Sequence, residues 1–181
     1  MDDKRGRFEA QVMPHLDAAH RFARWLARSP GEADDIVQEA FLRAFRGFEA
    51  LRGSDVKAWL LTIVRNCHAT ARTQQQRRAE SPLPDADEVQ FDAAVVASEP
   101  GPESASIEHD DQRQLERLIA ALSQEHREVL QLREMEEMTY REIAVVTQLP
   151  IGTVMSRLAR ARAALKLQWL QECAGEPHAV R

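Results

Sequence analysis

Residues 138–166, MTYREIAVVTQLPIGTVMSRLARARAALK, predict two helices separated by a tight turn. Thr139 and Glu142 have the spacing of a capping box, and the apolar pair Met138 and Ile143 has that of a hydrophobic staple, so a helix should begin here. This helix is short, because Gln148-Leu149-Pro150 interrupts it after only two turns. The pattern predicts a helix-turn-helix.

The helix predicted from Ile151 to about Cys173 carries two different faces. One narrow arc is apolar and should pack on the preceding helix; it holds Val154, Leu158, Ala161 and Leu165. A second arc, roughly 100° wide, carries hydrogen-bonding and cationic side chains: Thr153, Ser156, Arg157 and Arg160. Arginines in a major groove can bond to guanine edges or phosphates, and hydroxyl groups at the helix start can bond to phosphate. The two helices together therefore indicate DNA binding.

Near the other end of the chain, residues 29–48 read SPGEADDIVQEAFLRAFRGF and predict an amphipathic helix. Ser29 and Glu32 form a second capping-box pattern, with proline at the first helical position. Half of the wheel is apolar, whereas the other half carries Asp35, Gln38 and Glu39 with Leu42 among them. A solvated face explains the three polar residues, but an apolar residue within a polar rim favours a docking surface for another protein.

Residues 47–53 read as a short loop, after which Ser54 is expected to cap a long helix. Val56, Trp59, Leu60, Ile63, Val64 and Cys67 form an apolar stripe along it, which indicates a core-facing side. The opposite side carries Lys57, Thr62, Arg65, Asn66, His68 and Arg72. Such a face suits a nucleic-acid backbone and exposed base edges, although an ordinary wet helix face has the same composition.

Composition limits the remaining possibilities. The 181 residues carry a net charge of −5, but residues 1–78 hold fourteen Lys and Arg against ten Asp and Glu. Residues 79–105 hold seven acidic residues, no basic ones and four prolines, which predicts a mobile linker that lets two domains sit apart. The two cysteines have no CxxC spacing, so neither a disulfide framework nor a zinc site is expected. No secretory signal, membrane span or catalytic constellation is recognisable, which predicts a cytoplasmic protein that is not an enzyme and needs no metal or cofactor.

Three segments resemble the bacterial sigma-70 family, in the short form of its extracytoplasmic-function (ECF) group. They are ADDIVQEAFLRAF (33–45), DVKAWLLTIVRN (55–66) and LSQEHREVLQLREMEEMTYREIAVVTQLPIGTVMSRLARARAAL (122–165). The resemblance implies an all-α fold of two small helical domains and no large third one. It divides the chain into region 2 (1–78), an acidic linker (79–105), region 4 (106–174) and a tail (175–181).

The family's functional residues carry over by position. The resemblance implies that Asp35, Gln38, Glu39 and Leu42 face the β′ clamp helices of core RNA polymerase, and that the β flap is a further contact. It places the −10 promoter strand near Arg52, Ser54, Lys57, Arg65, Asn66 and Arg72, and the −35 element near Thr153, Ser156, Arg157 and Arg160. It also implies an anti-sigma partner, a linker that threads through the polymerase channel, and a part in a stress or environmental response. No small-molecule substrate is implied.

A second class of protein stays open from the residues alone. A stand-alone repressor or activator would use the same helix-turn-helix and would need its N-terminal helices to sense a ligand or to form a dimer. It would bind its operator without polymerase, and this separates the two classes.

Overall fold

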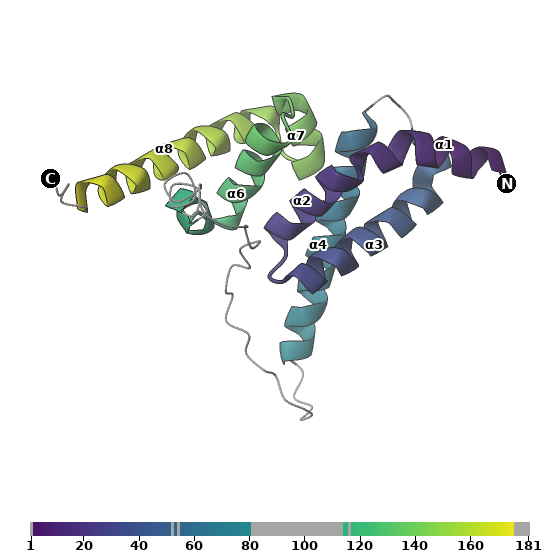
Figure 1. Ribbon diagram of the computed structural model, residues 1–181, viewed down its shortest axis with the longest axis horizontal. Coiled ribbons are helices and arrows are strands. Elements are labelled where there is room, and N and C mark those ends of the chain that lie inside the picture. Colours follow the sequence, from purple (N-terminus) through teal and green to yellow (C-terminus); the bar gives the residue numbers. More distant parts are fainter. Residues whose placement is uncertain (1, 52, 54, 81–113, 116, 176–181) are drawn as a thin grey trace, which may run out of the picture.

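The computed structural model describes residues 2–51, 53, 55–80, 114–115 and 117–175, and every regular element in these ranges is helical. The helices form two groups, one from each half of the chain (Figure 1). The predicted all-α architecture with two helical domains is therefore confirmed. Most of the predicted linker lies outside the described residues, and its first two residues, 79 and 80, continue a helix.

The N-terminal domain begins with two helices that share one apolar stripe. A proline at position 14 separates α1 (Asp2–Val12) from α2 (Leu16–Leu26), and a short 3-10 turn, η1 (Met13–His15), joins them. The stripe continues across the break, because Val12 on α1 and Phe22 on α2 are both fully buried. Two longer helices complete the domain: α3 (Pro30–Gly47), followed by the turn η2 (Phe48–Ala50), and α4 (Val56–Glu80).

An aromatic cluster closes the end of this domain where α1 meets α3. The ring of Phe8 stands edge-on to those of Phe41, Phe45 and Phe48, with centroids 6.4, 5.2 and 5.4 Å away. Such T-shaped pairs add about 0.5–1.5 kcal/mol each to the area that they bury. Trp59 on α4 packs at the edge of the same core, as the sequence predicted.

Two helix starts differ in detail from the prediction. Ser29 Oγ accepts from the Glu32 amide at 3.2 Å, but the Glu32 carboxylate accepts from the Arg28 amide at 2.7 Å, one residue earlier than a capping box requires. The cap of α4 is Asp55 and not Ser54, since Asp55 Oδ1 accepts from the Ala58 amide at 2.9 Å. A carboxylate one position later thus sets the start of α4.

The C-terminal domain is built around the predicted helix-turn-helix. Residues 117–120 are helical, and α6 (Gln124–Leu130) follows, with Ser123 as its cap. One turn of π-helix, η3 (Gln131–Met135), then leads to α7 (Tyr140–Thr147) and α8 (Ile151–Gly175). Both α6 and α7 pack against α8.

The two domains pack against each other, which the sequence did not predict. Helix α4 lies along α7, and α2 lies beside α6 and η3. The buried residues of both domains form one continuous cluster, from Phe8 to Ala161. No helix in the described part of the chain has the length and hydropathy that a membrane crossing requires.

Candidate functional site

The helix-turn-helix has the local hydrogen bonds that its sequence predicted. Thr139 Oγ1 accepts from the Glu142 amide at 3.3 Å, and the Glu142 carboxylate accepts from the Thr139 amide at 2.5 Å. These two bonds hold the pKa of Glu142 below its ordinary 4.5. Gln148 ends α7 in the left-handed region, at φ 56°. A left-handed residue reverses the chain in one step, so α8 can begin at Ile151.

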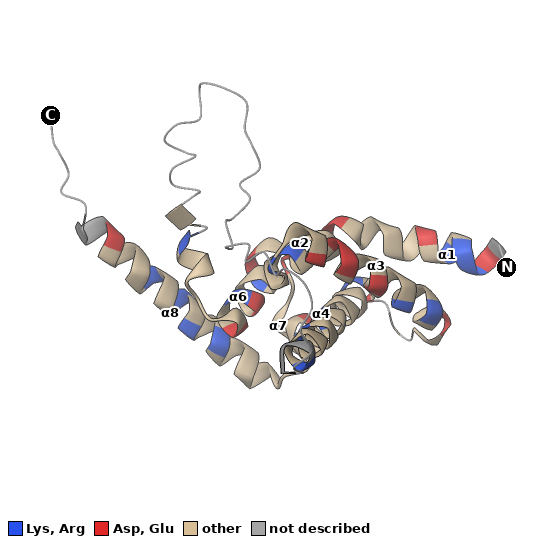
Figure 2. Cartoon of the chain, turned by 90° about the horizontal axis from the view of Figure 1, so that it is seen from below, with Lys and Arg blue, Asp and Glu red and all other residues tan. Residues whose placement is uncertain are grey.

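The four side chains predicted to read DNA from α8 do not share one environment. Ser156 and Arg160 are exposed, whereas Thr153 and Arg157 are half-buried. Arg157 forms an ion pair with Glu125 on α6 at 3.1 Å, and Ser156 Oγ donates to the Thr153 carbonyl at 3.0 Å. Arg160 has no ion pair or side-chain hydrogen bond within the described residues, which distinguishes it from Arg157. Basic residues follow one another along α8 in Figure 2.

Two apolar side chains beside this set were missed by the sequence argument. Ile151 and Met155 begin α8 and are 44% and 51% exposed. The sequence could have revealed them, because residues four apart share a helix face and this pair lies outside the buried stripe. Apolar groups at this end of a recognition helix can contact thymine methyl groups.

On α3 the structure exposes the predicted docking ridge. Asp35, Gln38 and Leu42 face solvent, Leu42 with 48% of its surface. Glu39 is half-buried and accepts from Arg43 Nε at 2.6 Å, which raises the pKa of that guanidinium. The ridge is therefore polar at its rim with an apolar side chain in it, as a protein interface requires.

A hollow of about 440 Å³ adjoins the ridge, between α3 and α4. Asp35 and Glu39 line it from α3, and Cys67, Thr70 and Gln74 line it from α4. Burial raises the pKa of the Cys67 thiol, so this cysteine is protonated and unreactive near neutral pH. The predicted core position of Cys67 is confirmed.

The face of α4 predicted to meet nucleic acid is partly covered by the C-terminal domain. Arg65 Nε bonds to Glu128 Oε1 on α6 at 2.5 Å, and Arg72 donates to Gln124 at the start of α6. Asn66 stays exposed. The predicted positions Arg52 and Ser54 lie outside the described residues.

His68 was predicted on this side of α4, away from the core, and that prediction is wrong. Only 7% of its surface is exposed, because α4 is covered on more than one side. Burial lowers the pKa of His68 below its ordinary 6.5, so the imidazole is neutral at pH 7.

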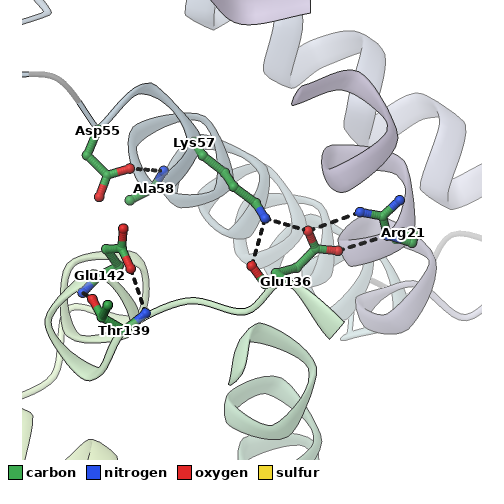
Figure 3. A network of polar contacts seen from close by, with 7 residues as sticks. All are labelled: Arg21, Asp55, Lys57, Ala58, Glu136, Thr139 and Glu142. Atoms are coloured by element: carbon green, nitrogen blue, oxygen red, sulfur yellow. Dashed lines mark hydrogen bonds and ion pairs between the residues drawn. The ribbon is translucent and has the colours of Figure 1, made fainter. Parts of the chain in front are cut away.

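The most enclosed contact between the domains surrounds Glu136 (Figure 3). The carboxylate of Glu136 has no exposed surface; Arg21 Nε and Nη2 reach it at 2.9 and 3.1 Å and Lys57 Nζ at 2.9 Å. Lys57 also donates to the Glu136 carbonyl at 2.8 Å. Glu137, next in the chain, adopts φ 54°, a left-handed conformation that is uncommon for residues other than glycine.

The fold and these surfaces define a protein of two helical domains with a helix-turn-helix in the second. Two family models match it: "Sigma-70 region 2" over residues 11–78 and "Sigma-70, region 4" over residues 112–165. The chain belongs to the sigma-70 family of RNA polymerase sigma factors, in its ECF group. Below, the N-terminal domain is called region 2 and the C-terminal domain region 4.

Curated relatives agree with this assignment over most of their length. The chain is 34% identical to the ECF RNA polymerase sigma-E factor of Escherichia coli over 151 residues, which are 81% of this chain and 79% of that protein. It is 36% identical to the RNA polymerase sigma-H factor of Pseudomonas aeruginosa over 138 residues, 74% and 71% of the two chains.

Solved structures show the same fold. The sigma factor RpoE of Bartonella quintana, in complex with the anti-sigma factor NepR, matches with a TM-score of 0.66 and 26% identity, over 88% of this chain and 94% of that one. CnrH in complex with the cytosolic domain of CnrY matches with a TM-score of 0.57 and 23% identity, over 90% and 86%.

Proposed function

We propose that this sigma factor binds core RNA polymerase through the ridge on α3 and directs it to promoters that its two domains read together. The observation that carries the proposal is the exposed ridge on α3 in the same chain as a helix-turn-helix with an exposed Arg160. The protein supplies sequence choice and strand capture, and the polymerase supplies the chemistry. It acts in the cytoplasm as an initiation factor, not as an enzyme.

The proposed division of DNA contacts follows the two domains. Region 4 reads the −35 element through the exposed start of α8, where Ser156, Arg160 and Met155 face outward. Region 2 holds the −10 strand on α4, where Lys57, Arg65 and Asn66 lie. Each domain alone touches few bases, so both must act on one polymerase to reach a useful affinity.

An anti-sigma partner is part of the proposal. Its support is that the Bartonella quintana sigma factor described above was solved in complex with an anti-sigma factor. We further propose that the acidic linker separates the two readers within the polymerase, and that the protein serves a stress or environmental response.

Run-off transcription with purified core polymerase tests the function directly. Wild-type protein added to core should produce discrete transcripts from a library of promoter fragments, and core alone should not. In a gel shift, the free protein should bind duplex promoter DNA weakly, and the complex with core should bind it strongly. Tight duplex binding without core would support the stand-alone regulator instead.

A substitution on the ridge tests the docking surface. Leu42→Ser should weaken co-purification with core polymerase, because the apolar centre of the interface is lost. Leu170→Ser is a matched control, since Leu170 on α8 is 54% exposed and far along the chain from the ridge. Equal binding by both variants, with helical circular dichroism unchanged, would rule out the ridge as the docking site.

A further inference from the structure

The carboxylate of Glu136 is buried against an anion-binding site that region 2 supplies. Arg21 on α2 and Lys57 on α4 converge on it, and both cations belong to the other domain (Figure 3). A buried carboxylate requires such pairing, because an uncompensated charge in the interior is strongly unfavourable. The arginine fork and the lysine ammonium together suit an anion with two or more oxygens.

A phosphate group has the same requirements as this carboxylate. The fork of a guanidinium binds either group through two parallel hydrogen bonds, and an ammonium adds a point charge. When region 4 leaves, Arg21 and Lys57 remain on region 2 without their anion. Arg21 carries none of the DNA contacts assigned above, but its guanidinium reaches the same anion as Lys57.

Two further contacts of region 4 reach this face of α4, although Asn66 and Arg72 stay exposed. Glu128 pairs with Arg65, and Gln124 accepts from Arg72, so polar groups of α6 occupy the cations farther along α4. Three of the side chains expected to hold the −10 strand are therefore engaged at once, and Lys57 and Arg65 keep only 28% of their side-chain surface exposed.

We propose that Glu136 stands in for a promoter phosphate: it fills an anion-binding site formed by Arg21 and Lys57, and the same site binds a backbone phosphate of the −10 strand once region 4 has moved away. This inference rests on the proposed function and adds Arg21 to its DNA-binding residues. In the closed form, region 4 packs on region 2 and Glu136 contacts Arg21 and Lys57; in the open form, region 4 has moved away. Only the open form can bind the strand at this site. The apparent dissociation constant for DNA is then the intrinsic one divided by the open fraction.

The first test is Glu136→Gln in the full-length chain, with Glu137→Gln as its control. Both variants remove one negative charge at neighbouring positions, but Glu137 is exposed and makes no side-chain contact with Arg21 or Lys57. Small-angle scattering should show a larger radius of gyration for Glu136→Gln alone. Fluorescence anisotropy with a short labelled single strand of random sequence should show tighter binding, by about ten-fold if one wild-type molecule in ten is open.

The second test asks whether Arg21 contacts a phosphate or only holds the two domains together through Glu136. Arg21→Gln is combined with Glu136→Gln, and Arg24→Gln, an exposed arginine on the same helix, serves as the control in the same background. If Arg21 binds phosphate, the first double variant should lose the gained affinity. The slope of log K against log salt concentration should also become shallower by about 0.7, the value for one phosphate contact with a single strand.

Each outcome decides the question. If Glu136→Gln and the shorter Glu136→Asp keep the wild-type radius and affinity, the closed form does not depend on this carboxylate and the proposal fails. If they open but Arg21→Gln behaves like Arg24→Gln, the site does not bind phosphate and the proposal fails as well. Should Glu136→Gln lose its helical circular dichroism, Glu136→Asp alone gives the answer. Failure of the proposed function looks different, since wild-type protein would then give no transcripts with core polymerase, whatever the Glu136 variants do.

Discussion

At the scale of single residues, the charge state of a buried ionisable group in this protein depends on the side chains that the other domain places next to it. Glu128 and Glu136 are buried because arginine and lysine from region 2 neutralise them. Among the described residues, His68 has no such anion in direct contact; burial lowers its pKa and the nearby charge of Glu32 opposes this only in part, so the neutral form is favoured. Its two neighbours Arg65 and Arg72 add to this effect, since nearby positive charges also lower its pKa.

His68 predicts a loss of stability in mild acid. Its pKa is lower in the folded state than the ordinary 6.5, so the unfolded chain binds a proton first. The free energy of unfolding is therefore not reduced by His68 above about pH 6.5. It falls as the pH decreases through that value toward the folded pKa. In urea titrations, His68→Gln should flatten this part of the profile. Some slope should remain, because burial also lowers the pKa of His15.

The arginines of α8 predict two different mutational effects. If the Arg160 guanidinium contacts a base, Arg160→Ala should weaken promoter recognition by about 1–3 kcal/mol, seen as less transcription from a mapped promoter. Thermal stability should be unchanged. Arg157→Ala should also lower stability slightly, by at most about 1 kcal/mol, because its ion pair with Glu125 is partly exposed. A stability loss in the Arg160 variant, or unchanged transcription, would contradict the assignment of Arg160.

At the scale of elements, caps decide where the helices of the helix-turn-helix begin. Thr139→Ala should destabilise the protein by about 1 kcal/mol, because the Glu142 amide at the start of α7 loses its acceptor, the Thr139 hydroxyl. Thr139→Ser keeps the hydroxyl and should lose much less. Chemical denaturation measures both, and equal losses would mean that the methyl group of Thr139, not the cap, stabilises this turn.

The starts of the helices could be predicted from the sequence, but the covering of the polar face of α4 could not. A cap is formed within four residues, so Ser29 and Thr139 were visible in the sequence. The cap of α4 was misplaced by one position because Ser54 and Asp55 are both good caps and only the backbone selects between them. Which partner covers a polar helix face depends on other elements, and periodicity carries no information about it.

At the scale of the whole molecule, one cluster of buried residues joins the two domains. Thermal unfolding should therefore follow a single transition by calorimetry, although the chain has two domains. A second, resolved transition in the wild-type protein would show that the domains do not unfold as one unit.

A double-mutant cycle on Arg65 and Glu128 measures what one contact between domains contributes. Glu128→Gln alone leaves Arg65 without its anion, and Arg65→Gln alone leaves a buried carboxylate. The coupling energy should be about 0.5–3 kcal/mol. A cycle with Arg162 and Glu134, an exposed pair within region 4, should give less than about 1 kcal/mol.

The sequence by itself determined the helices, the two-domain plan, the helix-turn-helix and the exposed ridge with Leu42. These follow from bonds and periodicities within a few turns of one helix, so local chemistry is enough. Only the tertiary structure decided that Lys57 and Arg65 are covered, since their partners lie 79 and 63 residues away. The contact from Arg21 to Glu136 spans 115 residues, and no local pattern indicates which of many acidic residues an arginine will meet across a domain boundary.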